Sequence, residues 1–163
     1  MDKSKARELF YYIPETGILT NRIGRSSRSK AGDVPGYIGR NGYQQIYVDG
    51  KIYYAHRLIW LHVHGAFPPE QIDHINGDRT DNRIENLRAV NNQENHRNER
   101  KSKNNTSGAT GVFWAAKISK WRGQIRIGKK NIHLGVFDNW FDAVCARKSA
   151  EKKYGFHPNH GRA

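Results

Sequence analysis

Apolar and polar residues alternate in short runs along the first third of the chain, and turn residues separate the runs. Residues 8–22 hold two apolar runs divided by a proline and a Thr-Gly pair, which predicts a strand, a turn and a second strand. Residues 42–54 alternate around Asp49 and Gly50, a pair typical of a tight hairpin because both turn positions need a positive φ. Between these hairpins, residues 23–36 are rich in Ser, Gly, Arg and Lys, and we expect a flexible basic loop.

The middle of the chain changes from a helical run to short strands with polar flanks. Residues 55–64 fit a short helix ended by Gly65, and two prolines break the chain soon afterwards. Short strands are predicted over 71–75 and 86–90, with a polar loop rich in turn residues between them. From Asn91, a suitable N-terminal cap, the chain is compatible with a helix.

Residues 111–137 alternate most clearly, with the period of two that is typical of half-buried strands. We expect a turn at 128–131, and then an amphipathic helix within 138–155 that Asn139 and Asp142 cap. One face of the central strand carries Trp121, Gly123, Ile125 and Ile127, and the other carries Arg122, Gln124 and Arg126. The helix residues expected to cover the sheet are Trp140, Ala143, Val144 and Ala150, and both tryptophans are expected in the core.

Composition adds two constraints on the organisation of the chain. Hydrophobic residues make up 36% of the 163 residues, a low share that favours two small cores over one large core. Cys145 is the only cysteine, which excludes an internal disulfide and any zinc site with several cysteines.

Charge indicates the kind of partner. The formal net charge is +13 with neutral histidines, which favours a polyanion, most often nucleic acid. Residues 101–163 hold 13 Lys and Arg against 3 Asp and Glu, so this part is expected to make most of the contacts. An anionic membrane is the alternative partner, but no long apolar run, secretory signal or lipidation motif is visible.

Candidate chemistry begins with Asp73 and His74, which stand together at the end of an apolar run. Hydrolysis of a phosphodiester needs an activated water and a cation that stabilises charge on the phosphate. Hard cations prefer carboxylate and amide oxygens, and a histidine can take a proton near neutral pH. Asp73 with a later asparagine could therefore hold a metal ion, with His74 as the base. A polar loop with a turn-capping Asp-His pair is the alternative.

The segment DHINGDRTDNRIENLRAVNNQEN, residues 73–95, resembles the HNH motif in the form found in phage and intron homing endonucleases. This resemblance implies a β-hairpin and a helix around one divalent metal ion per site, Mg²⁺ in preference to Mn²⁺. It implies that His74 is the general base and that Asp73 beside it is a metal ligand. It also implies that Asn86 braces the loop and orients the histidine.

The last motif position falls on Asn95, which the resemblance makes the second metal ligand. His96 is the alternative, and on a helix two adjacent side chains diverge by about 100°, so one ion cannot face both equally. The upstream segment YYAHRLIW, residues 53–60, also resembles the stretch that precedes the motif in that family. It implies that His56 supports the site, whereas a packed or loop-bonding histidine is the alternative.

Residues 110–155 resemble the plant ethylene-response-factor (APETALA-two) DNA-binding domain through GV, W, IRI, LGVF and an Ala-rich helix. That domain, three strands on one helix, also occurs attached to phage HNH nucleases. Phe113 and Ala115 stand where the plant pattern has arginines, and His133 where it often has Trp, so a plant target sequence cannot be carried over. The residues expected to contact DNA are Arg57, Arg122, Gln124, Arg126, Lys129, Lys130 and His133.

These features predict an α+β protein in two domains. An HNH nuclease domain of the ββα-metal (His-Me finger) type is expected over 1–100, with N-terminal β-hairpins and a motif core at 52–100. A linker over 101–108 leads to an ethylene-response-factor-like domain over 109–155, in which a three-stranded antiparallel sheet packs on one helix. A loose tail is expected over 156–163.

The function expected is that of a metal-dependent, homing-type DNA endonuclease that hydrolyses or nicks duplex DNA. Double-stranded DNA is the expected partner, with no membrane or protein partner, for a monomer or weak dimer. The expected location is the cytoplasm, that of the host cell if a phage encodes the chain. A non-catalytic, sequence-preferring DNA-binding protein is the alternative, and a nuclease that acts on RNA is a third.

Overall fold

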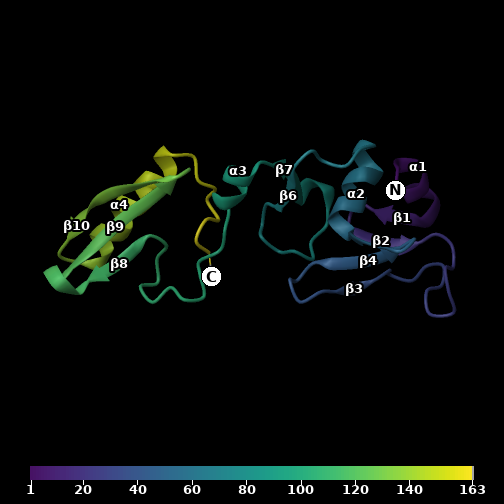
Figure 1. The fold of residues 1–163 in the computed structure, drawn as a ribbon, viewed down its shortest axis with the longest axis horizontal. Helices are drawn as coiled ribbons and strands as arrows, with labels where there is room; N and C mark the ends of the chain where they lie inside the picture. The colour runs from purple at the N-terminus through teal and green to yellow at the C-terminus, as the bar shows by residue number, and fades with distance from the viewer. Residues whose placement is uncertain (163) are drawn as a thin grey trace. The chain divides into compact units, whose positions relative to one another are not determined.

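The structure is a computed structural model that describes residues 1–162, apart from the side chains of Asn92 and Gln93. The chain divides into two compact units, Met1–Asn91 and Asn92–Ala163. Figure 1 shows the first unit in purple to teal and the second in teal to yellow.

The first unit consists of small antiparallel sheets and two helices. Its sheets have the strand orders β1-β2, β3-β4-β5 and β6-β7. In chain order its elements are α1 (Lys3–Leu9), β1 (Phe10–Ile13), β2 (Ile18–Asn21), β3 (Tyr37–Ile38), β4 (Gln44–Val48), β5 (Lys51–Tyr54), α2 (Ala55–His64), β6 (Gln71–His74), the 3-10 turn η1 (Ile84–Asn86) and β7 (Leu87–Val90).

Local turn chemistry explains where these elements begin and end. Asp49 and Gly50 adopt φ of 47° and 77° in the tight turn between β4 and β5, which confirms the predicted hairpin. Gly65, with φ of 90°, ends α2 as predicted. The β1–β2 hairpin was also predicted, but α1 before it was not. This short helix begins after Asp2, whose side chain accepts a hydrogen bond from the Lys5 amide at 2.8 Å.

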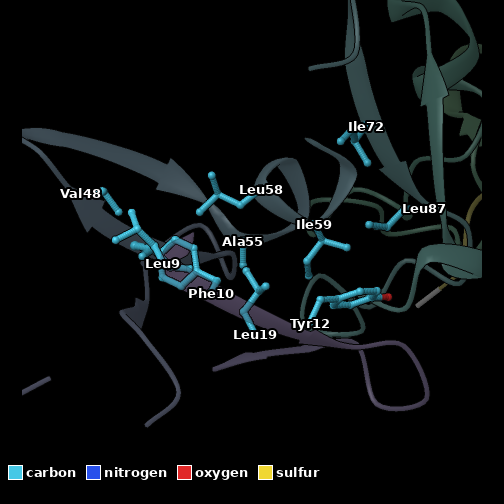
Figure 2. Packing of buried hydrophobic residues seen from close by; sticks show 11 residues of the cluster. Leu9, Phe10, Tyr12, Leu19, Val48, Ala55, Leu58, Ile59, Ile72 and Leu87 are labelled. Carbon is cyan, nitrogen blue, oxygen red and sulfur yellow. The ribbon is translucent and has the colours of Figure 1, made fainter. Parts of the chain in front are cut away.

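One hydrophobic cluster joins the helices and hairpins of the first unit (Figure 2). Its buried members are Leu9, Phe10, Tyr12, Leu19, Ile46, Val48, Ala55, Leu58, Ile59, Ile72 and Leu87. Ile72 lies on β6 and Leu87 on β7, so the cluster also anchors this last hairpin. Burying each of these two side chains contributes about 1.5–3 kcal/mol to the stability of the fold. Ile72 and Leu87 therefore attach the hairpin to the core.

The second unit contains a three-stranded antiparallel sheet with the order β10-β9-β8. Its elements are α3 (Asn92–His96), β8 (Val112–Ala115), the 3-10 turn η2 (Ala116–Ile118), β9 (Lys120–Ile127), β10 (Lys130–Phe137) and α4 (Trp140–Lys153). Gly123 and Ile125 on β9 and Ala143 on α4 are buried, and a Cβ at Gly123 would lie 3.6 Å from the carbonyl oxygen of Ala143. Small residues therefore let the helix approach the sheet closely.

Two local expectations for the second unit were wrong. The turn after β9 is tighter than expected, because β10 begins at Lys130 and pairs Lys130 with Ile127. Trp140 is not a core residue: 39% of it is exposed, and its indole N–H donates to the carbonyl of Ser107 at 2.8 Å.

The expectation of a loose C-terminal tail was also wrong. Backbone amides of His157 and Gly161 donate to the carbonyls of Arg97 and Glu99, at 3.1 and 2.9 Å. The amide of Lys101 donates back to the carbonyl of Arg162 at 2.9 Å. The tail is held because it pairs with the segment after α3, a long-range contact without a local signal. Among residues 1–162, no helix is both long and apolar enough to cross a membrane.

Candidate active site

Asp73 and His74 occupy the end of β6, where the strand pairs with β7. The register places Asp73 opposite Arg88 and His74 opposite Leu87. Successive side chains of a strand point to opposite faces, so the acid and the histidine meet different surroundings. Both are buried, with 8% and 3% of their surfaces exposed. An Asp-His pair that only capped a surface turn would be exposed.

The Asp73 carboxylate is held by a guanidinium across the strand pair. Arg88 Nε and Nη2 donate to Asp73 Oδ2 at 3.0 and 2.7 Å. Arg88 is itself partly exposed, so it can neutralise the buried acid while its own charge stays solvated. The two hydrogen bonds thus fix the orientation of the carboxylate.

The His74 ring is held by a hydrogen bond and by two other rings. Its Nε2 lies 3.0 Å from Asn82 Oδ1. The ring centroids of Tyr43 and His56 lie 5.7 and 5.2 Å from that of His74. Burial lowers the pKa of His74 from its usual 6.5, although the Asn82 hydrogen bond and the Asp73 charge act the other way. The ring is therefore neutral near pH 7, as a proton acceptor must be.

His56 lies deep beside the same ring. It stacks on Tyr54 with an interplanar angle of 10° and contacts Tyr43 at 5.0 Å between centroids. Burial, with the charges of His74 and Arg57, lowers the pKa of His56 to about 3. His56 thus stays neutral over the physiological range and packs against the His74 ring without adding a charge.

Asn86 fixes the loop that follows β6. Its Oδ1 accepts from the amide of Asn76 at 3.0 Å, and its Nδ2 donates to Asn76 Oδ1 at 3.0 Å and to the Asp81 carbonyl at 2.8 Å. Asp81 is paired with Arg83, whose hydrogen bond lowers the pKa of Asp81 to about 2. Asn86 therefore closes the loop on itself, whereas the side chain bonded to the His74 ring is that of Asn82.

An arginine ties this loop to the neighbouring sheet. Arg79 Nη1 donates to the carbonyl of Asn41 at 2.7 Å, and its guanidinium lies 4.9 Å from the centroid of the Tyr43 ring. Tyr43 in turn contacts both His56 and His74. The loop before β4 therefore forms one side of the site.

The donor atoms at β6 suit a hard cation. Asp73 supplies a carboxylate, and the predicted partner Asn95 would supply an amide oxygen, the ligand types that Mg²⁺ prefers. Among the described residues, no group of three or more His, Cys, Asp or Glu side chains is arranged to hold a metal ion.

The predicted second metal ligand, Asn95, and its alternative, His96, lie in the second unit. Asn95 is on α3 and half-buried, and His96 beside it is exposed, with Nδ1 2.7 Å from Glu99 Oε1. That Asn95 and Asp73 share one cation stays a prediction.

By cross-strand register, Arg122, Gln124, Arg126 and His133 share one face of the sheet, whereas Lys130 is opposite Ile127 on the other face. Arg122, Gln124 and Arg126 alternate along β9 and are exposed, and His133 pairs with Gln124 across β10. Lys129 lies in the β9–β10 turn and Lys130 at the start of β10, both exposed. Arg57, in the first unit, lies on α2, where its Nη1 donates to the carbonyl of Glu70 at 3.2 Å.

With this geometry in place, comparisons with known proteins define the class. Residues 53–97 match the model of a family described as HNH endonuclease. The chain belongs to this HNH endonuclease family. A relative that supports the assignment is Protein 3.8 of Escherichia phage T7, which is 34% identical over 87 residues, or 53% of this chain and 69% of that protein.

A solved structure, described as DNA binding and cleavage by the HNH homing endonuclease I-HmuI, is also similar. It is 24% identical, with a TM-score of 0.40, over 56% of this chain and 51% of that chain, about half of its length. The segment that matches the family model contains Asp73, His74, Asn86 and Asn95, and residues 1–52 lie outside it.

Sequence reasoning missed three residues of the site: Tyr43, Asn82 and Arg88. Arg88 could have been found by counting the register of the hairpin from Asp73, because cross-strand neighbours are paired one to one. Nothing local distinguishes Asn82 from the other asparagines of its loop, and Tyr43 reads as an ordinary strand residue.

Proposed function

We propose that this protein is a metal-dependent endonuclease of the homing type that hydrolyses or nicks phosphodiester bonds of duplex DNA. The observation that carries the proposal is the buried Asp73–His74 pair, in which the carboxylate and the imidazole each have a fixed hydrogen-bond partner. Burying two ionisable groups side by side costs free energy, and such groups are concentrated at functional sites. The phage relative supports a phage-encoded enzyme acting in the host cytoplasm.

The HNH resemblance implies a ββα-metal arrangement, in which Asp73 and Asn95 would hold one Mg²⁺ or Mn²⁺ ion. When bound, this ion would stabilise negative charge on the scissile phosphate. His74 accepts a proton from a water molecule as the water oxygen bonds to phosphorus. The bond from phosphorus to the departing sugar oxygen breaks, and that oxygen takes a proton from solvent. Asn86 keeps the loop beside His74 closed.

The sheet of the second unit is the proposed docking surface, in the manner of the ethylene-response-factor domain. Arg122, Gln124 and Arg126 present donors that can reach base edges in a major groove. Lys129 and Lys130, at the turn, would contact phosphates. His133, on the sheet of the second unit, and Arg57, in the first unit, are also proposed to contact DNA.

The proposal is tested with supercoiled plasmid in Mg²⁺ buffer. We expect His74→Ala to lose about 10²–10⁴-fold in cleavage rate, the usual contribution of a general base, while DNA affinity by fluorescence anisotropy is unchanged. His64→Ala is the matched control, since His64 is exposed and its ring contacts that of Trp60, with the centroids 4.2 Å apart. A fully active His74→Ala protein would refute the nuclease mechanism.

The basic, exposed sheet face also favours a second candidate, a DNA-binding protein without catalysis. That candidate predicts DNA binding with no cleavage in Mg²⁺ or Mn²⁺. A parallel digestion of RNA separates both from an RNA-directed nuclease.

A further inference from the structure

The hairpin β1–β2 reaches the active-site loop through a buried tyrosine. The Tyr12 hydroxyl accepts a hydrogen bond from the Ile84 amide at 2.9 Å and donates to the Asn82 carbonyl at 3.4 Å. Tyr12 is buried, and about 70 residues of chain separate it from Asn82. Residues 1–52, which include this hairpin, lie outside the segment that matches the family model.

The turn of the hairpin β1–β2 lies directly against the backbone of Asn82 and Arg83. A Cβ added at Gly17 would lie 2.3 Å from the Arg83 nitrogen and 2.6 Å from the Asn82 carbonyl carbon. Only glycine permits this approach, and its φ of 73° also favours glycine. Tyr12 and Gly17 thus hold the Asn82 backbone in place.

The held residue carries the side chain that bonds the proposed base. Asn82 is 2% exposed, and its Oδ1 faces His74 Nε2 at 3.0 Å. An amide oxygen has no hydrogen, so the ring nitrogen must donate. A neutral imidazole carries one ring proton, and one on Nε2 leaves the lone pair on Nδ1. The contacts with Tyr43 and His56 keep the ring from turning.

We infer that Asn82, fixed by Tyr12 and Gly17, is a positioning residue that keeps His74 protonated on Nε2, so that Nδ1 takes the proton from water. The catalytic part of this inference rests on the proposed nuclease function. The tautomer itself does not, because it is a property of the folded protein without metal or DNA. The hairpin β1–β2 is thereby part of the catalytic unit.

The tautomer is measured directly by long-range ¹H–¹⁵N correlation NMR on full-length, metal-free protein labelled with ¹⁵N-histidine at pH 7.5. We expect the His74 pattern of a ring protonated on Nε2 in the wild type. Asn82→Asp keeps an oxygen acceptor and should retain that pattern. Asn82→Leu and Tyr12→Phe should give a mixture of both tautomers. Tyr11→Phe, on the exposed face of the same strand, is the matched control and should match the wild type.

Kinetics on plasmid DNA supply the second readout. We expect Asn82→Leu to lower kcat about 10–100-fold, the usual effect of an outer partner, with KM unchanged. Asn82→Asp should recover most of the rate, Tyr12→Phe should lose several-fold, and Tyr11→Phe should lose none. A purely structural role would not separate the Leu and Asp variants in this way.

Several outcomes would overturn the inference. A wild-type His74 ring protonated on Nδ1 would show that the Asn82 amide nitrogen faces it. Unchanged tautomer and kcat in Tyr12→Phe would remove the hairpin from the mechanism. If Asn82→Leu does not fold, the wild-type spectrum and the Tyr12→Phe variant still test the inference. Tyr12→Phe keeps the aromatic ring that packs in the core. A wild-type protein that fails to cut DNA would sink the nuclease proposal, while the spectra would still decide the tautomer.

Discussion

Adjacent residues of one strand, Asp73 and His74, are given opposite electrostatic surroundings by the fold. Asp73 meets the guanidinium of Arg88, whereas His74 meets an amide and aromatic rings, and burial lowers the pKa of His74. The acid therefore has a cationic partner, whereas the amide and the rings that contact the histidine are uncharged. The strand alternation separates them, and the register supplies their partners.

At this scale the buried neutral histidines predict a pH dependence of stability. The pKa of His56 is about 3 in the folded protein and near 6.5 when unfolded, so below pH 6.5 the unfolded chain binds the proton more readily. Stability is therefore highest above pH 6.5. From His56 alone, it should fall by up to about 1.4 kcal/mol per pH unit as the pH drops toward 3.

Urea unfolding at pH 7.5, 6.0 and 5.0 measures this effect. Because other histidines also titrate, the comparison is between the wild type and His56→Asn, whose free energy of unfolding should fall less steeply with acid. Parallel curves for the two proteins would contradict the assignment of a buried neutral His56.

At the scale of elements, three hairpins and α2 meet in one cluster, and the active-site hairpin is one of them. Ile72 and Leu87 hold β6 and β7 in that cluster, while the β1–β2 turn packs on the loop between them. The hairpins themselves follow from local turn chemistry, as at Asp49 and Gly50. How hairpins pack on one another does not, because it depends on side chains far apart in the chain.

The packing of β1–β2 on the loop predicts unequal costs for two glycine substitutions. Gly17 and Gly32 both have positive φ, 73° and 86°, but a Cβ at Gly32 would meet no atom within 4 Å. Gly32→Ala should cost about 1–2 kcal/mol, the penalty of a left-handed conformation. Gly17→Ala adds overpacking against backbone, for a total of about 2–5 kcal/mol. Urea unfolding of both variants measures the difference, and equal losses would contradict the close approach.

At the scale of the whole molecule, the buried Asp73–His74 pair and most of the net positive charge lie in different units. The pair lies in the first unit, and the basic sheet lies in the second. In the second unit the tail pairs with the segment after α3, so the helix that carries Asn95 belongs to the same compact body as that sheet.

The basic sheet predicts a strong dependence of DNA affinity on salt. Each phosphate contact releases counterions, so the logarithm of affinity should fall linearly with the logarithm of salt concentration. We expect the double change Lys129→Gln and Lys130→Gln to reduce the slope by about two, one for each lost contact. The matched control is Lys152→Gln with Lys153→Gln on α4. Anisotropy in EDTA with the full-length protein measures both, and equal slopes in all three proteins would exclude the turn from the interface.

The sequence by itself determined the hairpins β1–β2 and β4–β5, the helices α2 and α4, the exposed basic face of β9 and the position of the Asp-His pair. These depend on the period of apolar residues, the φ that a turn demands and the count of charges, and all three are local. Only the tertiary structure decided that Arg88 holds Asp73, that Asn82 holds His74, that Tyr12 reaches across to Asn82, and that the C-terminal residues are paired. Those contacts join residues from 8 to about 70 positions apart, and they exist because the strand register and one shared core bring their backbones together.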